Sequence, residues 1–258
     1  LNIPAQINGL PVTTIGEKAF QYTSITNTIL PASVTKIESF AFNRSSSLES
    51  VTMPGIENIG AAAFAYCFSI ESITLPDSLQ AIGNNAFIYC NSLISLSIPD
   101  SVQSIGTQAL FGCSALTSIT VDANNSHYKS INNVLFNKSG TELIQYAPSL
   151  TASSYTAPNN VETISEGAFF NCSLESVTLP DSLHIIEGNA FNFCSSLTSI
   201  NLPINLQSIG FFAFSSCSSL TSLTLPASVT SIGNEAFTFC RKLESITFLS
   251  TTPPTVGS

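Results

Sequence analysis

Charged side chains are scarce in this chain of 258 residues, at 9% of the composition, and tryptophan is absent. Soluble domains carry roughly 25% charged residues, so most of this surface is expected to consist of uncharged polar groups. The seven basic residues are scattered along the chain against 16 acidic ones, which gives a net charge of −9. Nucleic-acid binding needs a basic face, and this distribution excludes one.

Long apolar runs are also missing. No uninterrupted run reaches the roughly 18 residues that a membrane-spanning helix requires, so we expect no membrane insertion in this segment. No charged-then-apolar signal peptide opens the chain. Because the sequence starts at Leu1 rather than at methionine, we interpret it as a cut or processed segment.

What the sequence does contain is an internal repeat. A phenylalanine, once replaced by leucine, recurs in steps of 22 or 23 residues apart from one step of 59, with an isoleucine five residues earlier and an alanine directly before it. A fixed period of this length indicates stacked coils, because one coil cannot bury its own apolar residues. The nine positions are Phe20, Phe42, Phe64, Phe87, Leu110, Phe169, Phe191, Phe214 and Phe237.

Each repeat joins two patterns, written LxxLxLxx(S/N)x(V/L)xxIGxxAFxxC. The alternation in the first half predicts a strand with one buried face, ended by a proline such as Pro226. In the second half, apolar residues at i, i+4, i+5 and i+8 predict a short helical turn, as in Ile232–Cys240. Glycines such as Gly210 are expected to supply the bend between the halves. Corner residues such as Ser228 are expected to bond the turn backbone of their own or the next coil.

The first half is the leucine-rich-repeat signature. We therefore predict an α/β leucine-rich-repeat solenoid. It is expected to be a right-handed, curved array of about eleven coils, with a parallel β-sheet on one face and short helical turns on the other. Residues 1–258 form a single solenoid in this prediction. Because Thr252–Ser258 starts a further coil without completing it, we expect the array to be truncated here and the native chain to continue.

The step of 59 residues marks an insertion at about 122–150. After it, Ala152–Pro158 keeps the apolar positions and the proline of a strand. Within the insertion, Val134–Tyr146 contains two apolar runs around a polar turn with a glycine, which predicts a β-hairpin projecting from the side of the solenoid. Two interpretations of this hairpin remain: it packs against the solenoid without a function of its own, or it forms a specialised contact site.

The runs LPASVTSIGNEAFTFCRKLESI, LPDSLQAIGNNAFIYCNSLISLSIP and LPINLQSIGFFAFSSCSSLTSLTLP resemble the BspA-like leucine-rich repeats of surface proteins from host-associated bacteria and some protozoan parasites. The insert NNVLFNKSGTELIQYAP is similar to an interruption in that family. The resemblance covers the chain apart from the insertion, and Leu110 in place of phenylalanine is one departure. It implies a cell-surface or secreted, adhesin-like protein that binds other proteins, such as host matrix or surface proteins.

Seven cysteines each follow the phenylalanine position by three residues, at the spacing of the repeat rather than of metal ligands. We predict a column of buried, reduced thiols. His127 and His184 stand alone, and no Ser/His/Asp set or phosphate-binding glycine loop occurs. We therefore expect no enzyme, no catalytic residue, no metal and no cofactor. The cysteines are Cys67, Cys90, Cys113, Cys172, Cys194, Cys217 and Cys240.

The remaining patterned surface is the solvent side of the strands, where outward positions form two rows of mostly hydroxyl side chains about 4.8 Å apart. Solenoids use their strand side to bind extended partners; alternatively, serine and threonine simply suit exposed strands and bond across coils. We predict a non-enzymatic protein-interaction module; a glycan-binding surface or a structural spacer are the alternatives. The candidate binding residues are Ser72, Thr74, Ser95, Ser97, Ser118, Thr120, Ser176, Thr178, Ser199, Asn201, Ser222 and Thr224.

Overall fold

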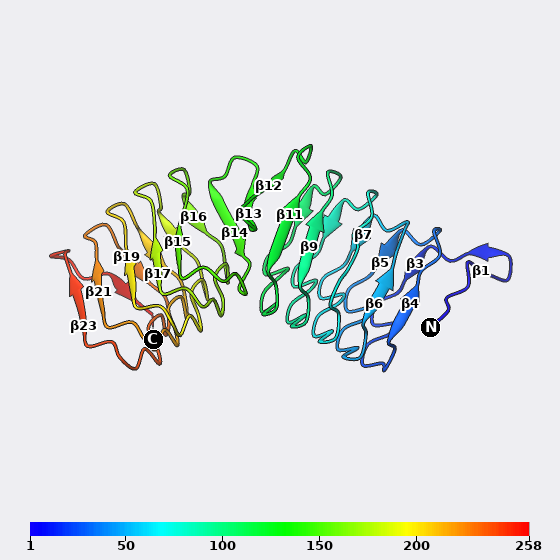
Figure 1. The fold of residues 1–258 in the computed structure, drawn as a ribbon, viewed down its shortest axis with the longest axis horizontal. Helices are drawn as coiled ribbons and strands as arrows, with labels where there is room; N and C mark the ends of the chain where they lie inside the picture. The colour runs from blue at the N-terminus through cyan, green and yellow to red at the C-terminus, as the bar shows by residue number, and fades with distance from the viewer. Residues whose placement is uncertain (258) are drawn as a thin grey trace. The chain divides into compact units, whose positions relative to one another are not determined.

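The computed structural model describes residues 1–257 and divides into two compact units, Leu1–Asn133 and Val134–Ser258, which we call the N-terminal and C-terminal units. Within each unit the chain winds through successive coils that lie side by side (Figure 1). Neighbouring coils pair through two parallel ladders of short strands, one for each half of the repeat. The chain forms about eleven coils in all, which confirms the predicted stacking of repeats.

The first ladder is formed by the LxxLxL segments, as their alternation predicts. In the N-terminal unit β4 (Asn27–Ile29) pairs with β6 (Ser50–Thr52), β9 (Ser95–Ile98) pairs with β11 (Ser118–Val121), and a single bridge joins Ser72 to Ser95. In the C-terminal unit β15 (Ser154–Thr156), β17 (Ser176–Thr178) and β19 (Ser199–Asn201) form one sheet, and β21 (Ser222–Leu225) and β23 (Ser245–Phe248) another. All these pairs are parallel, so equivalent side chains of adjacent coils are neighbours.

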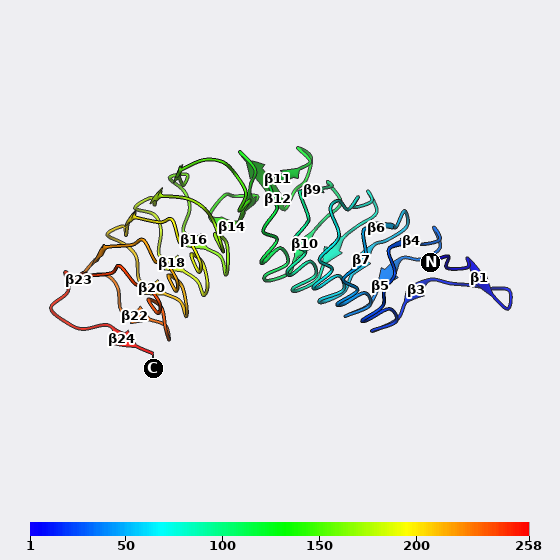
Figure 2. The ribbon, with the colours of Figure 1, turned by 60° about the horizontal axis from the view of Figure 1, so that its bottom comes forward.

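The second ladder consists of short strands that carry the repeated isoleucine (Figure 2). The N-terminal unit contributes β3 (Thr14–Ile15), β5 (Lys36–Ile37), β7 (Asn58–Ile59), β8 (Ala81–Ile82) and β10 (Ser104–Ile105). The C-terminal unit contributes β14 (Glu142–Tyr146), β16 (Thr163–Ile164), β18 (Ile185–Ile186), β20 (Ser208–Ile209), β22 (Ser231–Ile232) and β24 (Thr255–Val256). A separate antiparallel pair, β1 (Gln6–Ile7) and β2 (Leu10–Pro11), lies at the N-terminus.

The prediction of a helical turn in the second half of each coil is wrong, because no helix occurs within residues 1–257. In Gly210–Cys217 the amides alternate between two kinds of partner. The Phe214 amide donates to the Ala236 carbonyl of the next coil (2.8 Å), whereas the Ser215 amide donates backward to the Phe212 carbonyl (3.0 Å). Phe212 has φ of 51°, in the left-handed region. A helix needs every residue right-handed and every bond within its own segment, so this turn bonds to the next coil instead.

The glycines after the isoleucines do not supply a bend, which corrects a second prediction. Gly210 does not adopt a left-handed φ; instead, a Cβ added there would lie 2.3 Å from the Gly188 amide nitrogen of the preceding coil. At Gly83 the same added atom would lie 2.6 Å from the Ala61 nitrogen. Gly16, by contrast, would meet nothing within 4 Å. Glycine is needed here because adjacent backbones approach closely.

The polar corner residues bond the preceding coil, not their own or the next one as predicted. The Ser228 hydroxyl donates to the Leu206 carbonyl (2.7 Å), and the Ser101 hydroxyl donates to the Leu79 carbonyl (2.7 Å). Each bond satisfies a carbonyl in the turn after a strand. The corner therefore links adjacent coils through side chains as well as backbone.

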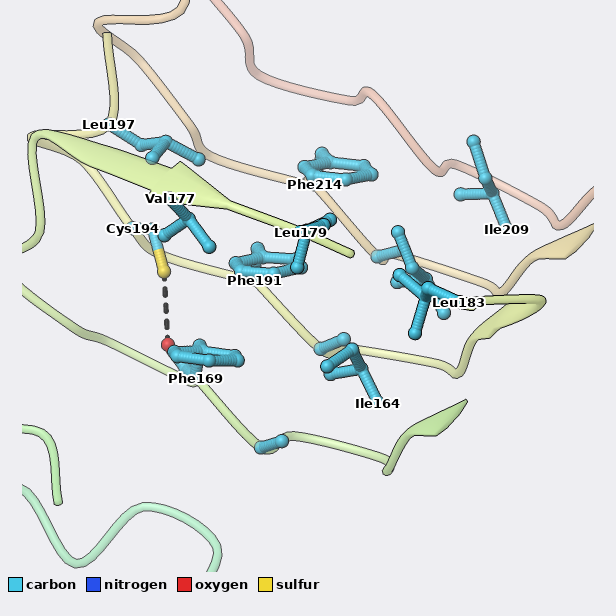
Figure 3. Close-up of a cluster of buried hydrophobic side chains, with 14 of the residues drawn as sticks. Ile164, Phe169, Val177, Leu179, Leu183, Phe191, Cys194, Leu197, Ile209 and Phe214 are labelled. Atoms are coloured by element: carbon cyan, nitrogen blue, oxygen red, sulfur yellow. Dashed lines mark hydrogen bonds between the residues drawn. The ribbon is translucent and has the colours of Figure 1, made fainter. Parts of the chain in front are cut away.

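The core of each unit is a column of stacked phenylalanine rings. In the C-terminal unit the ring of Phe191 stacks on those of Phe169 and Phe214, with centroids 4.8 and 5.2 Å apart (Figure 3). Beside the column, the Cys194 thiol donates to the Phe169 carbonyl (2.9 Å). Phe42, Phe64 and Phe87 form the equivalent column in the N-terminal unit. The predicted inward set of isoleucine, alanine, phenylalanine and cysteine is confirmed by the burial of nearly all its members.

The first part of the insertion covers the last coil of the N-terminal unit. Asn125 is fully buried, and its side-chain amide donates to the Pro99 carbonyl (2.8 Å). Next to it, β12 (Tyr128–Ile131) places the Ser130 hydroxyl where it accepts a hydrogen bond from the Val121 amide (3.1 Å). Backbone groups that would otherwise lack a neighbouring coil are satisfied in this way.

The second part of the insertion is a hairpin, but it does not project. β13 (Val134–Asn137) pairs antiparallel with β14, and β14 also pairs in parallel with β16. Phe136 and Leu143 are fully buried, because the apolar side chains of the hairpin pack into the core of the C-terminal unit. The Tyr146 ring stacks on Phe169 with centroids 5.2 Å apart. The hairpin thus replaces part of a coil, with Tyr146 in the position of the repeated phenylalanine.

Candidate binding surface

The strands of the first ladder turn alternate side chains to solvent. In β9, Leu96 and Ile98 are buried whereas Ser95 and Ser97 are exposed. All twelve predicted binding residues lie at such outward positions; ten are exposed, and Ser118 and Ser176 are partly buried. We call this surface the strand face: Ser72, Thr74, Ser95, Ser97, Ser118 and Thr120 in the N-terminal unit, and Ser176, Thr178, Ser199, Asn201, Ser222 and Thr224 in the C-terminal unit.

Few of these side chains are engaged by the protein itself. The Ser118 hydroxyl donates to Asn133 Oδ1 (2.9 Å), and the Asn201 amide both donates to and accepts from the Leu179 backbone (3.2 and 3.1 Å). The other ten form no side-chain hydrogen bond with any residue in the described part of the chain. Hydrogen bonding across coils therefore does not explain why hydroxyls recur here, and these groups are free to bond a ligand.

The strand face of the N-terminal unit contains an open hollow of about 730 Å³. Its floor includes Ser97 and Thr120 on two adjacent strands. Three carboxylates line one side of it, Asp77, Asp100 and Asp122, and all three are exposed. Asp77 and Asp100 stand at the same position of successive coils, each directly after the proline that follows the strand segment. Asp122 stands one position earlier in the next coil, at the position that Pro99 holds. The hollow is therefore lined both by hydroxyls without a hydrogen-bond partner within the described residues and by negatively charged carboxylates.

A second hollow, of about 460 Å³, lies on the strand face of the C-terminal unit. Ser199 and Thr224 belong to its polar lining, but Ile204 and Leu249 also line it and are exposed. Ile204 stands after Pro203, at the position that Asp77 and Asp100 hold in the N-terminal unit. The two hollows share hydroxyl groups and differ in the chemistry of their borders.

The three aspartates are residues that the sequence analysis missed. A Pro-Asp pair at the end of a strand was visible at Pro76–Asp77 and at Pro99–Asp100. Aspartate after proline is common in turns, so these pairs alone do not indicate a site. The structure adds that both aspartates line one hollow together with Asp122.

The cysteine column offers no metal chemistry. Burial raises the pKa of the Cys67 and Cys113 thiols to about 12, so both remain protonated at neutral pH. Metal binding requires the thiolate. All seven cysteines are free thiols, and six of them are buried. Among residues 1–257, no group of three histidine, cysteine or acidic side chains is placed to hold a metal ion.

The two histidines lie apart from the cysteine column and from each other. His127 is exposed, and its Nδ1 lies 3.0 Å from the Ser126 hydroxyl. His184 is partly buried after the strand β17, where its backbone carbonyl accepts hydrogen bonds from the next coil. Ser126 is the neighbouring residue in the chain, and no carboxylate pairs with the His127 ring in any contact recorded within residues 1–257.

Aromatic side chains gather in the turns of the N-terminal unit, away from the strand face. The Arg44 guanidinium lies over the rings of Tyr22 and Tyr66, 5.8 and 4.5 Å from their centroids. Tyr66 in turn stacks on Tyr89, with centroids 5.3 Å apart. Stacked rings and a guanidinium cover each other's faces, and the face is what a bound sugar would use. This column therefore holds coils together and gives little support to a glycan site.

Coils of 22–23 residues, paired through two parallel ladders around a phenylalanine column, define a leucine-rich-repeat β-solenoid with an open polar strand surface. A family model described as the BspA type leucine rich repeat region matches six copies over residues 13–142 and 144–254. The chain belongs to this family, which confirms the resemblance. No catalytic family is indicated, and families of this kind are typically non-enzymatic binding modules.

Solved structures of bacterial leucine-rich repeat proteins are similar over most of the chain. The pneumococcal vaccine antigen PcpA shares 25% identity with a TM-score of 0.83, over 96% of this chain and 71% of that one. A protein from Eubacterium ventriosum shares 25% with a TM-score of 0.71, over 86% and 72%. A leucine-rich cell surface protein from Faecalibacterium prausnitzii shares 26% with a TM-score of 0.68, over 97% and 87%. No curated protein sequence matches the chain.

Proposed function

We propose that this chain is a non-enzymatic protein-binding module of a cell-surface or secreted, adhesin-like protein, and that its partners bind the strand face. The observation that carries the proposal is the coincidence of both hollows with free outward hydroxyls. The family is one of interaction modules, and one structural neighbour is named a cell surface protein. Within residues 1–257 the structure has no helix of the length and hydropathy needed to cross a membrane.

Affinity at any one strand is expected to be weak. Tight interfaces are built around buried tryptophan, tyrosine and arginine, whereas the strand face presents serine, threonine and asparagine. Repetition compensates for this, because a partner that touches several coils gains from multivalency. Proteins are therefore favoured over small ligands, and host matrix or surface proteins are the partners that we propose.

The proposal is tested by measuring binding of the purified protein to immobilised extracellular-matrix proteins. We expect Thr74→Arg and Thr224→Arg, which place a long charged side chain on the strand face, to weaken binding about tenfold or more. Thr107→Arg is the matched control, because Thr107 is an exposed threonine on the turn side of the N-terminal unit. Loss of binding in the control but not in the strand-face variants would contradict the proposal. Binding to a glycan array without binding to proteins would favour the glycan alternative.

A further inference from the structure

The strand face of the N-terminal unit is bordered by acidic side chains at both ends of its strands. Asp77, Asp100 and Asp122 follow the strands and line the larger hollow. Glu49 and Glu71 precede them and line a smaller hollow of about 340 Å³. Ser72 belongs to the lining of both. Five carboxylates therefore surround one continuous stretch of free hydroxyls.

The basic side chains of this unit do not neutralise that border. Within the described residues, no lysine, arginine or histidine lines either hollow. Lys18 and Lys36 pair with Glu17 and Glu38 (2.8 and 3.1 Å) in the other half of the coil. Arg44 lies between tyrosine rings in the turns. Lys129 lies in β12, which contacts β11, and forms no salt bridge within the described residues. The strand face of the N-terminal unit consequently carries unbalanced negative charge in a unit that has basic residues elsewhere.

From this charge complementarity we infer that the N-terminal hollow binds an extended segment of a partner protein that carries lysine or arginine. The inference rests on the proposed strand-face function and specifies its ligand. The carboxylates would pair with the basic side chains, while the hydroxyls of Ser95, Ser97 and Thr120 hydrogen-bond the peptide backbone between them.

The spacing of the aspartates sets the spacing of the basic residues. Coils in a parallel ladder are about 4.8 Å apart, so the equivalent positions of Asp77 and Asp100 in adjacent coils are separated by about 5 Å. An extended peptide rises about 3.3 Å per residue, and its side chains at i and i+2 point to the same face about 7 Å apart. Long basic side chains at positions i and i+2 would therefore reach these two carboxylates together.

The C-terminal unit provides an internal comparison. At the place of the aspartates it has Asn159, Asp181, Ile204 and Ala227 in successive coils. A single carboxylate remains there, next to exposed apolar side chains. We expect the preference for basic segments to belong to the N-terminal unit alone.

The test uses the whole chain and a labelled peptide with lysine at every second position, KSKSKSK, against a matched peptide with glutamate, ESESESE. Fluorescence anisotropy is expected to show saturable binding of the lysine peptide only. Each of Asp77→Asn and Asp100→Asn should weaken it about twofold to fivefold, as expected for exposed ion pairs, and salt should weaken it further. Neither side chain makes a hydrogen bond within the described residues, so the variants should fold normally. Asp122 is left intact because its Oδ1 accepts the Asn124 amide (2.8 Å).

Asp181→Asn is the control and is expected to bind the lysine peptide like the wild type, because Asp181 holds the same corner in the C-terminal unit. Equal binding of the two peptides, or wild-type binding by the Asp77→Asn/Asp100→Asn double variant, would overturn the inference. If a partner protein binds and Thr74→Arg abolishes that binding while the double variant does not, the basic ligand is refuted and the strand-face function stands. If none of these variants affects a bound protein, the proposed function fails as well.

Discussion

Phe191 shows how much a single side chain contributes to the stacking of coils. It is fully buried and lies between two parallel rings of adjacent coils. Replacing it with alanine removes the buried ring and leaves a cavity between adjacent coils, whose backbones are hydrogen-bonded to each other. The cavity cannot close without moving the ladders, so the loss is expected at the upper end for core substitutions.

We predict that Phe191→Ala lowers the free energy of unfolding by about 3–5 kcal/mol. Phe193→Ala is the matched control, because Phe193 lies in the same turn with 52% of its surface exposed. Chemical denaturation of both variants measures the difference. A loss below about 1 kcal/mol for Phe191→Ala would mean that the buried face is assigned wrongly.

Gly210 tests a different kind of contact, the approach of one backbone to another. An alanine Cβ there would lie 2.3 Å from the Gly188 nitrogen, which neither coil can avoid without moving. We predict that Gly210→Ala lowers the melting temperature and costs about 1–3 kcal/mol, as overpacking does. Gly16→Ala, which meets nothing within 4 Å, should leave stability nearly unchanged. Equal effects at the two positions would show that backbone flexibility, and not close approach, makes glycine necessary.

The sequence predicts which side chains are buried in the core, residue by residue. It does not predict the structural role of every repeated residue. The recurrence of Phe191 and Cys194 identifies core positions because burial of an apolar stripe is what periodicity records. A glycine at the position of Gly210 also recurs, in six of the nine repeats. Glycine is required there because the backbone of the adjacent coil lies close. A periodic pattern cannot distinguish a glycine that allows a bend from one that allows a close contact.

The turns and ladders show the same limit of pattern analysis. The first ladder could be predicted from alternation, and β15 was found from a degenerate repeat. The second half of the coil has a helical spacing of apolar residues, yet its amides alternate between two coils. The spacing of apolar residues indicates which side chains face the core. It does not indicate which carbonyl accepts the hydrogen bond from each amide. The left-handed conformation of residues such as Phe212 cannot be predicted from the sequence, because phenylalanine rarely adopts a positive φ.

Carboxylates on neighbouring coils give the C-terminal unit a dependence on pH. Burial, together with nearby Glu142 and Glu166, raises the pKa of Glu187, although a hydrogen bond from the Glu166 amide (2.9 Å) lowers it. The folded chain therefore holds this proton more tightly than the unfolded chain does. Stability contributed by Glu187 is present at low pH and is lost as pH rises through the raised pKa.

We predict that Glu187→Gln is close to the wild type in stability near pH 4 and more stable near pH 7, because glutamine keeps the acceptor without the charge. Melting temperatures measured across this range test the prediction. Part of the side chain is exposed, so the difference should be small and should shrink with added salt. A variant less stable than the wild type at neutral pH would contradict the assignment.

The insertion shows why the longest-range features of the chain escape the sequence. Its hairpin could be predicted from two apolar runs, but not its burial, because nothing local indicates that Tyr146 replaces a phenylalanine. The hollow in the N-terminal unit likewise depends on three coils together. The outward position of the hydroxyl rows could therefore be predicted from the sequence, whereas the hollow that they share with the aspartates could not.

Both binding proposals depend on the register of the first ladder, in which Ser97 stands beside Thr120 one coil later. The most direct measurement is pyrene fluorescence of the chain carrying Ser97→Cys and Thr120→Cys. Cys240, which is only partly buried, is changed to serine in every variant. The other six native thiols should not react, because they are buried and, in Cys113, burial raises the pKa to about 12. We predict strong excimer emission from this pair and weak emission from Ser97→Cys with Thr107→Cys. Monomer emission alone, or labelling of the native cysteines before unfolding, would contradict the stacked-coil account.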